Sequence, residues 1–403
     1  MKKIAINIFA LGIIASAFTA CDDAKNDVID NMVYISEAAS DPSTEIILGQ
    51  AGEKSSTSIS VRMAHKVAAD TKVKLALDEG VLAAYNKLNQ TEYQIIPSEY
   101  VTFPAEVVIP AGSVSAEVEV EITSFDGEAG VEYAAPIKVM ESNGVQLSNS
   151  TSQYVITFGK VLRQYAPTFY YNNAMLMNWE NPVELSNFTL EWWVRCTGRS
   201  GTGGFSINNQ ALFSFVANYE LYVRFGDIVY VDKNTGRNMF NFLQIKTMGI
   251  DANYDSGDPN NNPLKGGEWI HFAHTYDAGT GDVVLYMNGV EVNRNNGGAG
   301  NVFTFTGLNM FSSGSSYFRD YIEMCQLRMW KTTRSAAQIQ KNMKKEVKYT
   351  DPNLVFYLPM NEGEGSDTLH DVTGNGHDCV IGSNTAAGGN NKYAQAWTEY
   401  SFE

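Results

Sequence analysis

The stretch that decides the fold is residues 269–289, WIHFAHTYDAGTGDVVLYMNG. An apolar, aromatic run at 269–276 ends in small and polar residues at 277–281, and a second apolar run at 283–287 leads into Asn288-Gly289. Asn-Gly after a strand predicts a tight hairpin turn, because both turn positions need a positive φ that these residues adopt readily. Apolar residues occupy both faces of 269–276, which predicts a strand covered on both sides.

Composition extends this expectation to the whole chain. Tyr, Phe, Asn, Gly and Thr are plentiful among the 403 residues, and long amphipathic helical patterns are nearly absent, which favours an all-β protein. A chain of this length can form two or three domains, each with its own core. The formal net charge of −16 would repel nucleic acid, and no cluster of Lys and Arg offsets it, so nucleic-acid binding is excluded.

The first residues carry the features of a bacterial export signal. Met1-Lys2-Lys3 precede an apolar run at 4–17, which is too short to span a membrane as a helix. Residues 18–21, FTAC, resemble a lipobox, in which Cys21 is acylated and becomes the mature N-terminus. Asp22-Asp23 resemble the acidic tag of surface lipoproteins in the Bacteroides group. Residues 1–20 are thus expected to be a lipoprotein signal peptide, and the alternative is a plain cleaved signal.

Lipid on Cys21 would anchor the protein in the outer membrane, at the cell surface. Residues 21–31 are polar and charged after the cysteine, as expected of a flexible tether. The other three cysteines, Cys196, Cys325 and Cys379, are widely spaced and odd in number. This spacing indicates neither a disulfide framework nor a zinc site, so all three are expected to be small buried hydrophobes.

Residues 32–160 are expected to form a first β domain. Apolar residues recur at a spacing of two in three segments, around residues 59–63, 73–77 and 118–122, and Pro136 suggests an edge strand. This pattern predicts an immunoglobulin-like sandwich, interrupted by one short helix at 81–88. The motifs YN at 85–86, IPAG at 109–112 and YAAPI at 133–137 resemble a domain of unknown function, DUF1735, of Bacteroides surface lipoproteins. The resemblance implies a spacer that precedes a glycan-related module.

Residues 161–403 are expected to form a second β domain, and four segments in chain order resemble laminin-G-like domains of the concanavalin-A-like class. They are FTLEWWV at 188–194, the 269–289 hairpin, LRMW at 327–330 with the capped helix that follows it, and NEG at 361–363 with DVTGNGH at 371–377. The sequence therefore predicts an all-β protein: an immunoglobulin-like β-sandwich followed by a concanavalin-A-like (laminin-G-like) jelly-roll β-sandwich. The second fold is mostly a binding platform, with glycans as frequent ligands.

Catalysis is not expected. Retaining glycosidases need two carboxylates about 5–5.5 Å apart, and the ExDxxE run that supplies them in this fold class is missing. Glu191 has no carboxylate two residues further on, and His271 and His274, three apart on a strand, point to opposite faces and cannot share a metal. No catalytic residues are therefore expected.

One loop suggests a cation. The segment 251–258, DANYDSGD, places oxygen ligands at alternate positions in Asp251, Asn253 and Asp255, which is reminiscent of a calcium loop. It departs from the EF-hand pattern, and a polar surface turn is the alternative. No cofactor is expected to be required, and calcium is the one metal that the sequence suggests.

Sugar sites combine an aromatic platform with Asn, Asp or Arg side chains. The tryptophans inside strand motifs, such as Trp269 and Trp330, are expected in the core. Aromatic residues in polar segments are the better candidates, although each can instead pack beneath its own loop. The glycan-binding candidates are Trp179, Tyr219, Tyr254 and Tyr317, with Arg319 beside the last.

The expected function is a cell-surface lipoprotein that binds an extracellular oligo- or polysaccharide for a polysaccharide-utilisation system, without catalysis. Its further partners would be the outer membrane, through the lipid, and outer-membrane glycan-uptake proteins. Two alternatives stay open: a divergent glycoside hydrolase or lyase on a concanavalin-A-like fold, and a protein-binding adhesion module.

A membrane-fractionation experiment tests the anchor. We expect the Cys21→Ala variant to leave the membrane fraction, because a lipid group with more than one acyl chain holds a protein stably on a bilayer. Cys379→Ala, which leaves Cys21 in place, is the control and should stay in the membrane fraction. A Cys21→Ala variant that still sediments with membranes would refute the lipobox interpretation.

Overall fold

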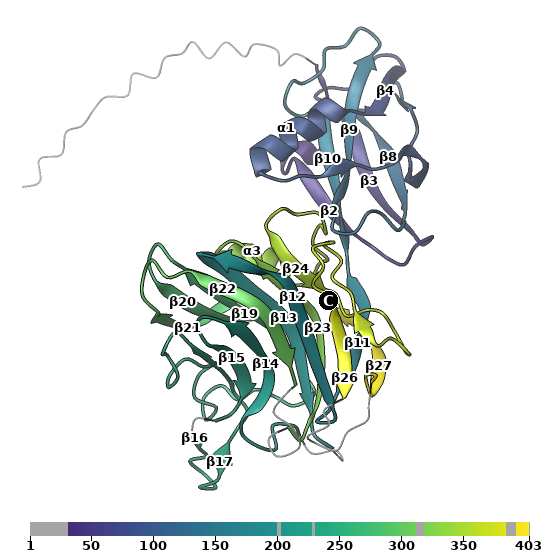
Figure 1. Cartoon of the computed structure of the whole chain (residues 1–403). Coiled ribbons are helices and arrows are strands. Elements are labelled where there is room, and N and C mark those ends of the chain that lie inside the picture. Colours follow the sequence, from purple (N-terminus) through teal and green to yellow (C-terminus); the bar gives the residue numbers. More distant parts are fainter. Residues whose placement is uncertain (1–30, 200–202, 228–229, 312–317, 384–391, 403) are drawn as a thin grey trace, which may run out of the picture.

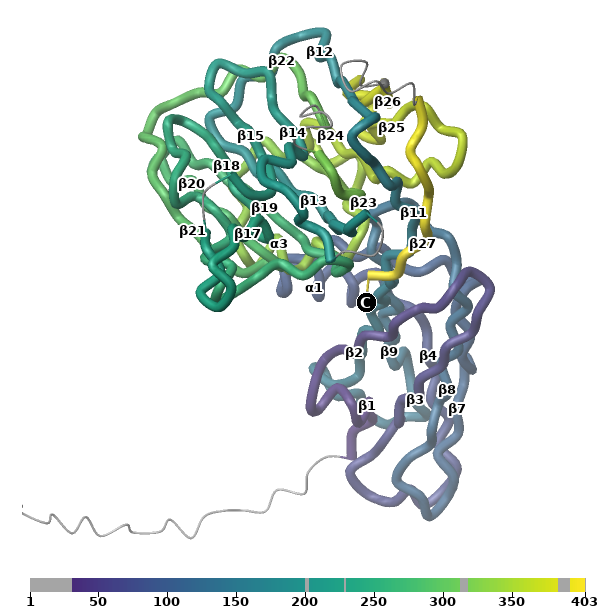
Figure 2. The backbone as a smooth tube through the Cα atoms, turned by 90° about the horizontal axis from the view of Figure 1, so that it is seen from below, coloured from purple at the N-terminus to yellow at the C-terminus, as the bar shows by residue number. Residues whose placement is uncertain are grey.

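The computed structural model describes residues 31–199, 203–227, 230–311, 318–383 and 392–402, and within them the chain forms two β-sandwiches stacked end to end (Figure 1). The two meet where the last strand of the N-terminal domain, β10(Gln153–Lys160), passes directly into the first strand of the C-terminal domain, β11(Leu162–Phe169) (Figure 1). Seen from below, the N-terminal domain lies beside β11 (Figure 2). The signal peptide, Cys21 and most of the tether lie outside the described residues. No helix in the described ranges is long and apolar enough to cross a membrane.

The N-terminal domain packs two sheets face to face. The first has the order β1(Val33–Ile35), β3(Lys54–Met63), β8(Ser115–Thr123) and β6(Val101–Thr102). The second has the order β2(Ser43–Leu48), β10(Gln153–Lys160), β9(Tyr133–Ser142), β4(Thr71–Leu77) and β7(Glu106–Ile109), with β5(Gln94–Ile95) beside β9. Short 3₁₀ turns lie at Glu37–Ala39 and Ser98–Tyr100. The period-two residues predicted from the sequence, such as Ile59, Val73 and Val118, are fully buried between the sheets.

The expectation that Pro136 marks an edge strand is wrong for the strand as a whole, because β9 lies between β10 and β4. At Pro136 itself, however, one side of β9 has no paired strand. On that side β5 pairs with β9 only as far as Ala134, and β4 pairs with β9 only from Ile137 onward. The Pro136 carbonyl accepts a hydrogen bond from the Asp78 amide on that side, 2.9 Å away. Pro136 therefore lies in the gap between the residues of β9 that pair with β5 and those that pair with β4. Its missing N–H interrupts no strand-to-strand hydrogen bonding there.

The predicted short helix is confirmed as α1(Glu79–Asn89). The Asp78 carboxylate caps it by accepting a hydrogen bond from the Val81 amide at 2.9 Å. Val81 and Leu82 bury its apolar side against Val155 on the outer face of the second sheet. The helix ends at Gln90, which adopts a left-handed conformation.

The C-terminal domain packs two larger sheets. The back sheet has the order β21(Val290–Asn296), β20(Asp282–Met287), β19(Trp269–Asp277), β13(Asn187–Thr197), β23(Tyr321–Trp330), β11(Leu162–Phe169) and β27(Ala396–Phe402), with β24(Leu354–Leu358) beside β23. The front sheet has the order β18(Leu243–Thr247), β15(Leu221–Phe225), β14(Gln210–Ala217), β22(Phe303–Met310), β12(Asn173–Leu185), β26(Cys379–Ser383) and β25(Thr368–Leu369). A small hairpin, β16(Tyr230–Val231) and β17(Asn238–Met239), stands apart.

The 269–289 stretch forms a hairpin of the back sheet, as predicted, with β19 paired to β13 and β20 next to the edge strand β21. β19 is buried along nearly its whole length, and Asn288 and Gly289 join β20 to β21 with φ values of 50° and 75°. His274 points into the core and His271 lies on the outer face beneath α3(Ala336–Asn342), which confirms that the two histidines lie on opposite faces. Cys196, Cys325 and Cys379 are buried and free, as predicted.

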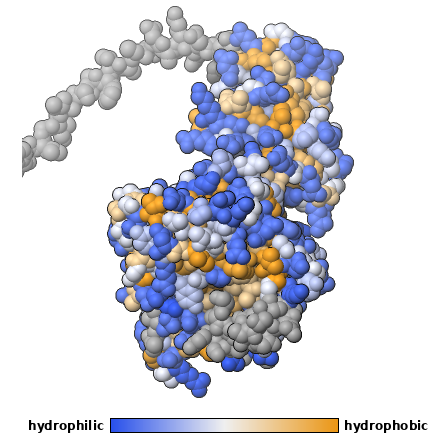
Figure 3. Space-filling model, viewed as in Figure 1, coloured by the Kyte–Doolittle hydropathy of each residue, from blue (hydrophilic) through white to orange (hydrophobic). Residues whose placement is uncertain are grey.

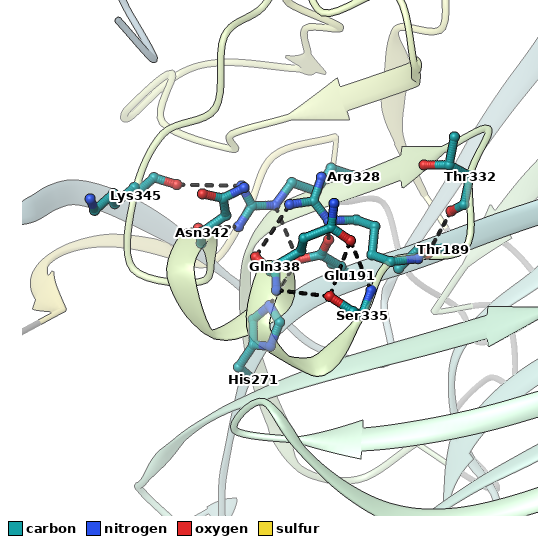
Figure 4. A network of polar contacts seen from close by, with 10 residues as sticks. Thr189, Glu191, His271, Arg328, Thr332, Ser335, Gln338, Asn342 and Lys345 are labelled. Atoms are coloured by element: carbon teal, nitrogen blue, oxygen red, sulfur yellow. Dashed lines mark hydrogen bonds and ion pairs between the residues drawn. The ribbon is translucent and has the colours of Figure 1, made fainter. Parts of the chain in front are cut away.

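The helix α3 covers part of the back sheet's outer face. Ser335 and Gln338 form the predicted capping box, and Ile339 packs against Ala273 and Val284. Arg328, on β23, donates from Nη2 to the Asn342 carbonyl at 3.0 Å and so binds the last turn of the helix. Figure 4 shows that Arg328 reaches this turn from beside Glu191.

Glu191 is the anionic centre of this buried network. Its oxygens lie 3.2 Å from Arg334 Nε, 3.8 Å from Arg328 Nε and 3.5 Å from His271 Nε2, which are charge contacts rather than well-aligned hydrogen bonds. Burial alone would raise the pKa of Glu191, but the two guanidinium groups and the imidazole outweigh it and lower that pKa to about 2. The carboxylate is therefore ionised and balances two arginines in a site closed to water.

Removal of this charge should unfold the C-terminal domain more readily. We expect Glu191→Gln to cost roughly 3–5 kcal/mol, because it leaves buried guanidinium charge without a counter-ion. In the wild type this contribution is complete above pH 4.5, the ordinary pKa of a glutamate, and is lost as the pH falls toward 2. Denaturant unfolding at neutral and acidic pH measures both effects. The exposed Glu119→Gln, on β8, is the control, and an equal loss in both variants would contradict this role.

Candidate functional site

The solvent face of the front sheet carries one continuous row of side chains. The strand registers align seven residues, one from each strand, and every one is exposed or half-exposed. In order across the sheet they are Thr368, Val380, Leu176, Asn309, Ser214, Tyr222 and Lys246. A ligand chain lying across the strands would meet apolar side chains at one end of this row and polar ones at the other.

The polar end is organised around Tyr222 and Arg224. The Tyr222 hydroxyl donates to Asn209 Oδ1 at 3.1 Å, and Arg224 Nη1 donates to the same oxygen at 3.2 Å. Arg224 Nε donates to Gln244 Oε1 at 2.9 Å, and its guanidinium lies 5.1 Å from the centre of the Tyr222 ring. Burial raises the pKa of Tyr222, which keeps its hydroxyl protonated as a donor. The Tyr222 ring is thus held by a neighbouring cation on its face and by a carboxamide at its hydroxyl.

The apolar end of the row consists of side chains that are exposed to solvent. Val380 and Leu176 are 55% and 44% exposed, and Val216, on the neighbouring β14, is 46% exposed. Figure 3 shows hydrophobic side chains gathered across the middle of this face of the C-terminal domain. An aromatic ring with carboxamide, hydroxyl and guanidinium neighbours beside such a patch is the arrangement that recognises flat, polyhydroxylated rings.

Two of the predicted platforms are core residues, which corrects the expectation that they stack on a ligand. Trp179 is 7% exposed and its ring centre lies 4.7 Å from that of His377, between the sheets. Its polar neighbours Asn178 and Glu180 suggested a loop, but β12 runs through this segment and the two merely alternate onto the outer face. Tyr254 is fully buried, and its hydroxyl lies 2.7 Å from His274 Nδ1.

The other predicted glycan contacts are scattered. Tyr219 is half-buried against Phe303, and its hydroxyl donates to Asn301 Oδ1 at 3.0 Å. Arg319 is exposed at the opposite end of β14, where its amide donates to Gln210. Tyr317 lies outside the described residues. The structure therefore does not bring these candidates together into one site.

The segment suggested for calcium is engaged in other contacts. Asp251 Oδ1 lies 3.3 Å from Arg224 Nη2, and a cation there would be repelled by the guanidinium. Asp255 is buried and accepts a hydrogen bond from the Tyr230 hydroxyl at 2.9 Å, while Asn253 is an exposed turn residue with φ of 69°. Within the described ranges no three His, Cys, Asp or Glu residues converge on a possible metal position. Calcium stays a prediction that these contacts do not favour.

Two carboxylates near the row are paired with Arg224. Asp227 and Asp251 both contact Arg224 Nη2, at 2.5 and 3.3 Å. The Arg224 guanidinium therefore lies against both carboxylates and pairs with both charges. Glu191, the other carboxylate considered from the sequence, is fully buried beneath α3.

The Tyr222 cluster was missed in the sequence although a signal was present. In LYVRF, residues 221–225, the apolar side chains alternate inward, which places Tyr222 and Arg224 side by side on the outer face. Asn209 and Gln244 come from other segments, and only the register of the folded sheet brings them to this pair.

The comparisons with known proteins agree with the fold of the two domains. Residues 170–340 match the model of the concanavalin A-like lectin/glucanases superfamily, in its laminin G form. The C-terminal domain is a concanavalin A-like domain. Residues 29–146 match a family model described as an N-terminal domain. A search of curated proteins found no match to the chain.

Among solved structures, a Bacteroides ovatus protein, provisionally described as carbohydrate-binding, is 18% identical with a TM-score of 0.61. The match covers 92% of this chain and 98% of that one, so the shared fold extends over both domains. A second Bacteroides ovatus structure, a multidomain protein including DUF1735, is 12% identical over 76% of this chain and 96% of that one. Its TM-score of 0.26 is too low to support an argument about fold.

The buried position of Trp179 has a measurable consequence. We expect Trp179→Ala to cost roughly 3–5 kcal/mol in unfolding free energy, because a large core ring is replaced by a cavity. Asn178→Ala, one residue earlier on the outer face of the same strand, should cost far less and serves as the control. Denaturant unfolding measures both, and a Trp179→Ala variant as stable as the wild type would refute the core assignment.

Proposed function

We propose that this protein binds an extracellular glycan on the open face of the front sheet and does not cleave it. The observation that carries the proposal is the Tyr222 cluster, in which one half-exposed ring is held by Arg224 and Asn209 at the polar end of the row. The concanavalin A-like fold and the provisional description of the Bacteroides ovatus neighbour as carbohydrate-binding support the same function.

The charges around the cluster support binding without turnover. In the described structure Asp227 and Asp251 are both paired with Arg224, and Glu220 is paired with Lys246. Carboxylates held in ion pairs by the side chains of the row position those side chains for a ligand, which favours binding over cleavage. The protein is accordingly proposed as a binding component of a polysaccharide-utilisation system.

The proposed location is the outer surface of the outer membrane, held by lipid on Cys21. Under this proposal residues 21–31 are the tether and the N-terminal domain is the spacer that lifts the binding face away from the bilayer. Outer-membrane glycan-uptake proteins are the proposed recipients of the captured sugar.

Affinity gels that contain different neutral polysaccharides test the binding face. We expect Tyr222→Ala to weaken retention at least about tenfold, because the variant loses the ring and the Asn209 contact together. Tyr165→Ala, which removes an exposed tyrosine from β11 of the other sheet, is the matched control and should bind as the wild type does.

A product assay runs in parallel with the same polysaccharides. Shortened oligosaccharides after long incubation with wild-type protein, lost in Asp227→Asn or Asp251→Asn, would replace the binding function by hydrolysis. Equal retention of the wild type and Tyr222→Ala would show that the glycan does not bind on this face. Failure of wild type to bind any glycan would favour protein adhesion through the apolar end of the row.

A further inference from the structure

A groove of about 580 Å³ lies between the two domains, within the roughly 300–1,000 Å³ that ligand sites usually occupy. One wall comes from the end of α1 and the residues after it, 89–94, and the other from α3 and the residues that follow it. Figure 1 shows α1 on the N-terminal domain above α3 on the C-terminal domain, and Figure 3 shows hydrophilic side chains on both sides of the notch between the two domains. This groove is separate from the front sheet.

The two walls are held at a fixed separation. Lys345 Nζ lies 2.7 Å from Glu132 Oε1, an ion pair between the domains that is about 30% exposed on each side. Gly130 has φ of 69°, and a β-carbon there would lie 2.1 Å from the Lys348 amide nitrogen. Only glycine allows the N-terminal domain to approach the C-terminal domain this closely, so the groove is preformed rather than a gap between loosely tethered bodies.

The deepest lining residues are organised by the buried network. Trp330 is 2% exposed, and the Arg334 guanidinium lies over it, 3.9 Å from the ring centre. Arg334 is held by Glu191 through Nε and by the Gln338 carbonyl through Nη2, at 3.2 and 3.3 Å. The floor of the groove is therefore a fixed aromatic–guanidinium pair, which needs no rearrangement when a ligand enters.

The walls are chemically suited to hydroxyl groups rather than to ions. Five carboxamide side chains line the groove, those of Asn89, Gln90, Gln94, Gln338 and Asn342. A carboxamide donates and accepts at once, as a sugar hydroxyl does. The lining holds four basic and four acidic residues, so the groove has no net charge although the chain carries −16. A charged ligand would gain no net attraction.

From this geometry we propose that the groove is a second ligand site, which takes a segment of a neutral oligosaccharide chain between α1 and α3. The smaller cavity on the other side of the Lys345–Glu132 contact, about 220 Å³, falls below the usual range for ligand sites and is not included. The site is independent of the front-sheet face, and each can exist without the other.

Hydrogen–deuterium exchange on the whole protein locates the bound sugar. The probes are short gluco-, manno-, xylo- and galacto-oligosaccharides, with an oligogalacturonate as the charged probe. We expect at least one neutral probe to slow exchange in both 89–94 and 337–342. The same protection should appear in Tyr222→Ala, in which the front-sheet cluster is disrupted.

Two alanine-to-tryptophan variants make the test specific. Ala337 lines the groove on the exposed side of α3, so Ala337→Trp fills the groove and should abolish this protection while retention through Tyr222 persists. Ala83→Trp, on the exposed side of α1 and outside the groove, is the matched control and should bind as the wild type does. Thermal melting confirms that both variants are folded.

Three outcomes would overturn the proposal: no protection of either wall by any neutral probe, protection that survives Ala337→Trp in a folded protein, or protection by the galacturonate alone. Loss of front-sheet binding with groove protection intact would contradict the proposed function and leave the groove site standing. Loss of groove protection with front-sheet binding intact would contradict the groove site and leave the proposed function standing, so the two failures are distinguishable.

Discussion

The burial of one carboxylate, Glu191, is the constraint on which the rest of the C-terminal half depends. Its negative charge allows Arg328 and Arg334 to be buried on the outer face of the back sheet, and those two arginines in turn bind the backbone of α3. A buried ion cluster of this kind adds little net stability by comparison with an apolar core, but it is costly to break. Its effect is to fix the position of a helix of only seven residues, which could not be stable alone.

The position of that helix determines how the two domains meet. Lys345 follows α3, reaches Glu132 of the N-terminal domain, and its own carbonyl accepts from Arg328 Nη1 at 3.4 Å. The Glu191 cluster thus contacts α3 and Lys345 through its arginines, and Lys345 contacts the N-terminal domain. Because β10 also continues directly into β11, the junction is held at two places, and the N-terminal domain is suited to present the C-terminal domain in one orientation.

The sequence predicted well what depends on alternation and local turn chemistry. The buried strand at 269–276, the Asn288-Gly289 turn, the Ser335 capping box and the burial of three cysteines all follow from neighbours in sequence. The sequence predictions were wrong where a polar segment was taken to expose its aromatic side chain. Around Trp179 the polar residues are the solvent face of a strand, and around Tyr254 a polar loop carries one ring inward to His274. Neither distinction is visible without knowing which sheet covers the segment.

The same limit explains why both candidate sites had to come from the structure. Each is assembled across strands or domains: Asn209 reaches Tyr222 through the pairing of β14 and β15, and Gln94 faces α3 only because Gly130 lets the domains touch. The two faces of the C-terminal sandwich consequently differ in kind. On the back sheet, the polar side chains beneath α3 bind one another and the backbone of the helix (Figure 4). On the front sheet, a row of polar side chains is exposed at the surface. Ligand binding is therefore expected on the front sheet and at the rim of α3, and not on the part of the back sheet that the helix covers.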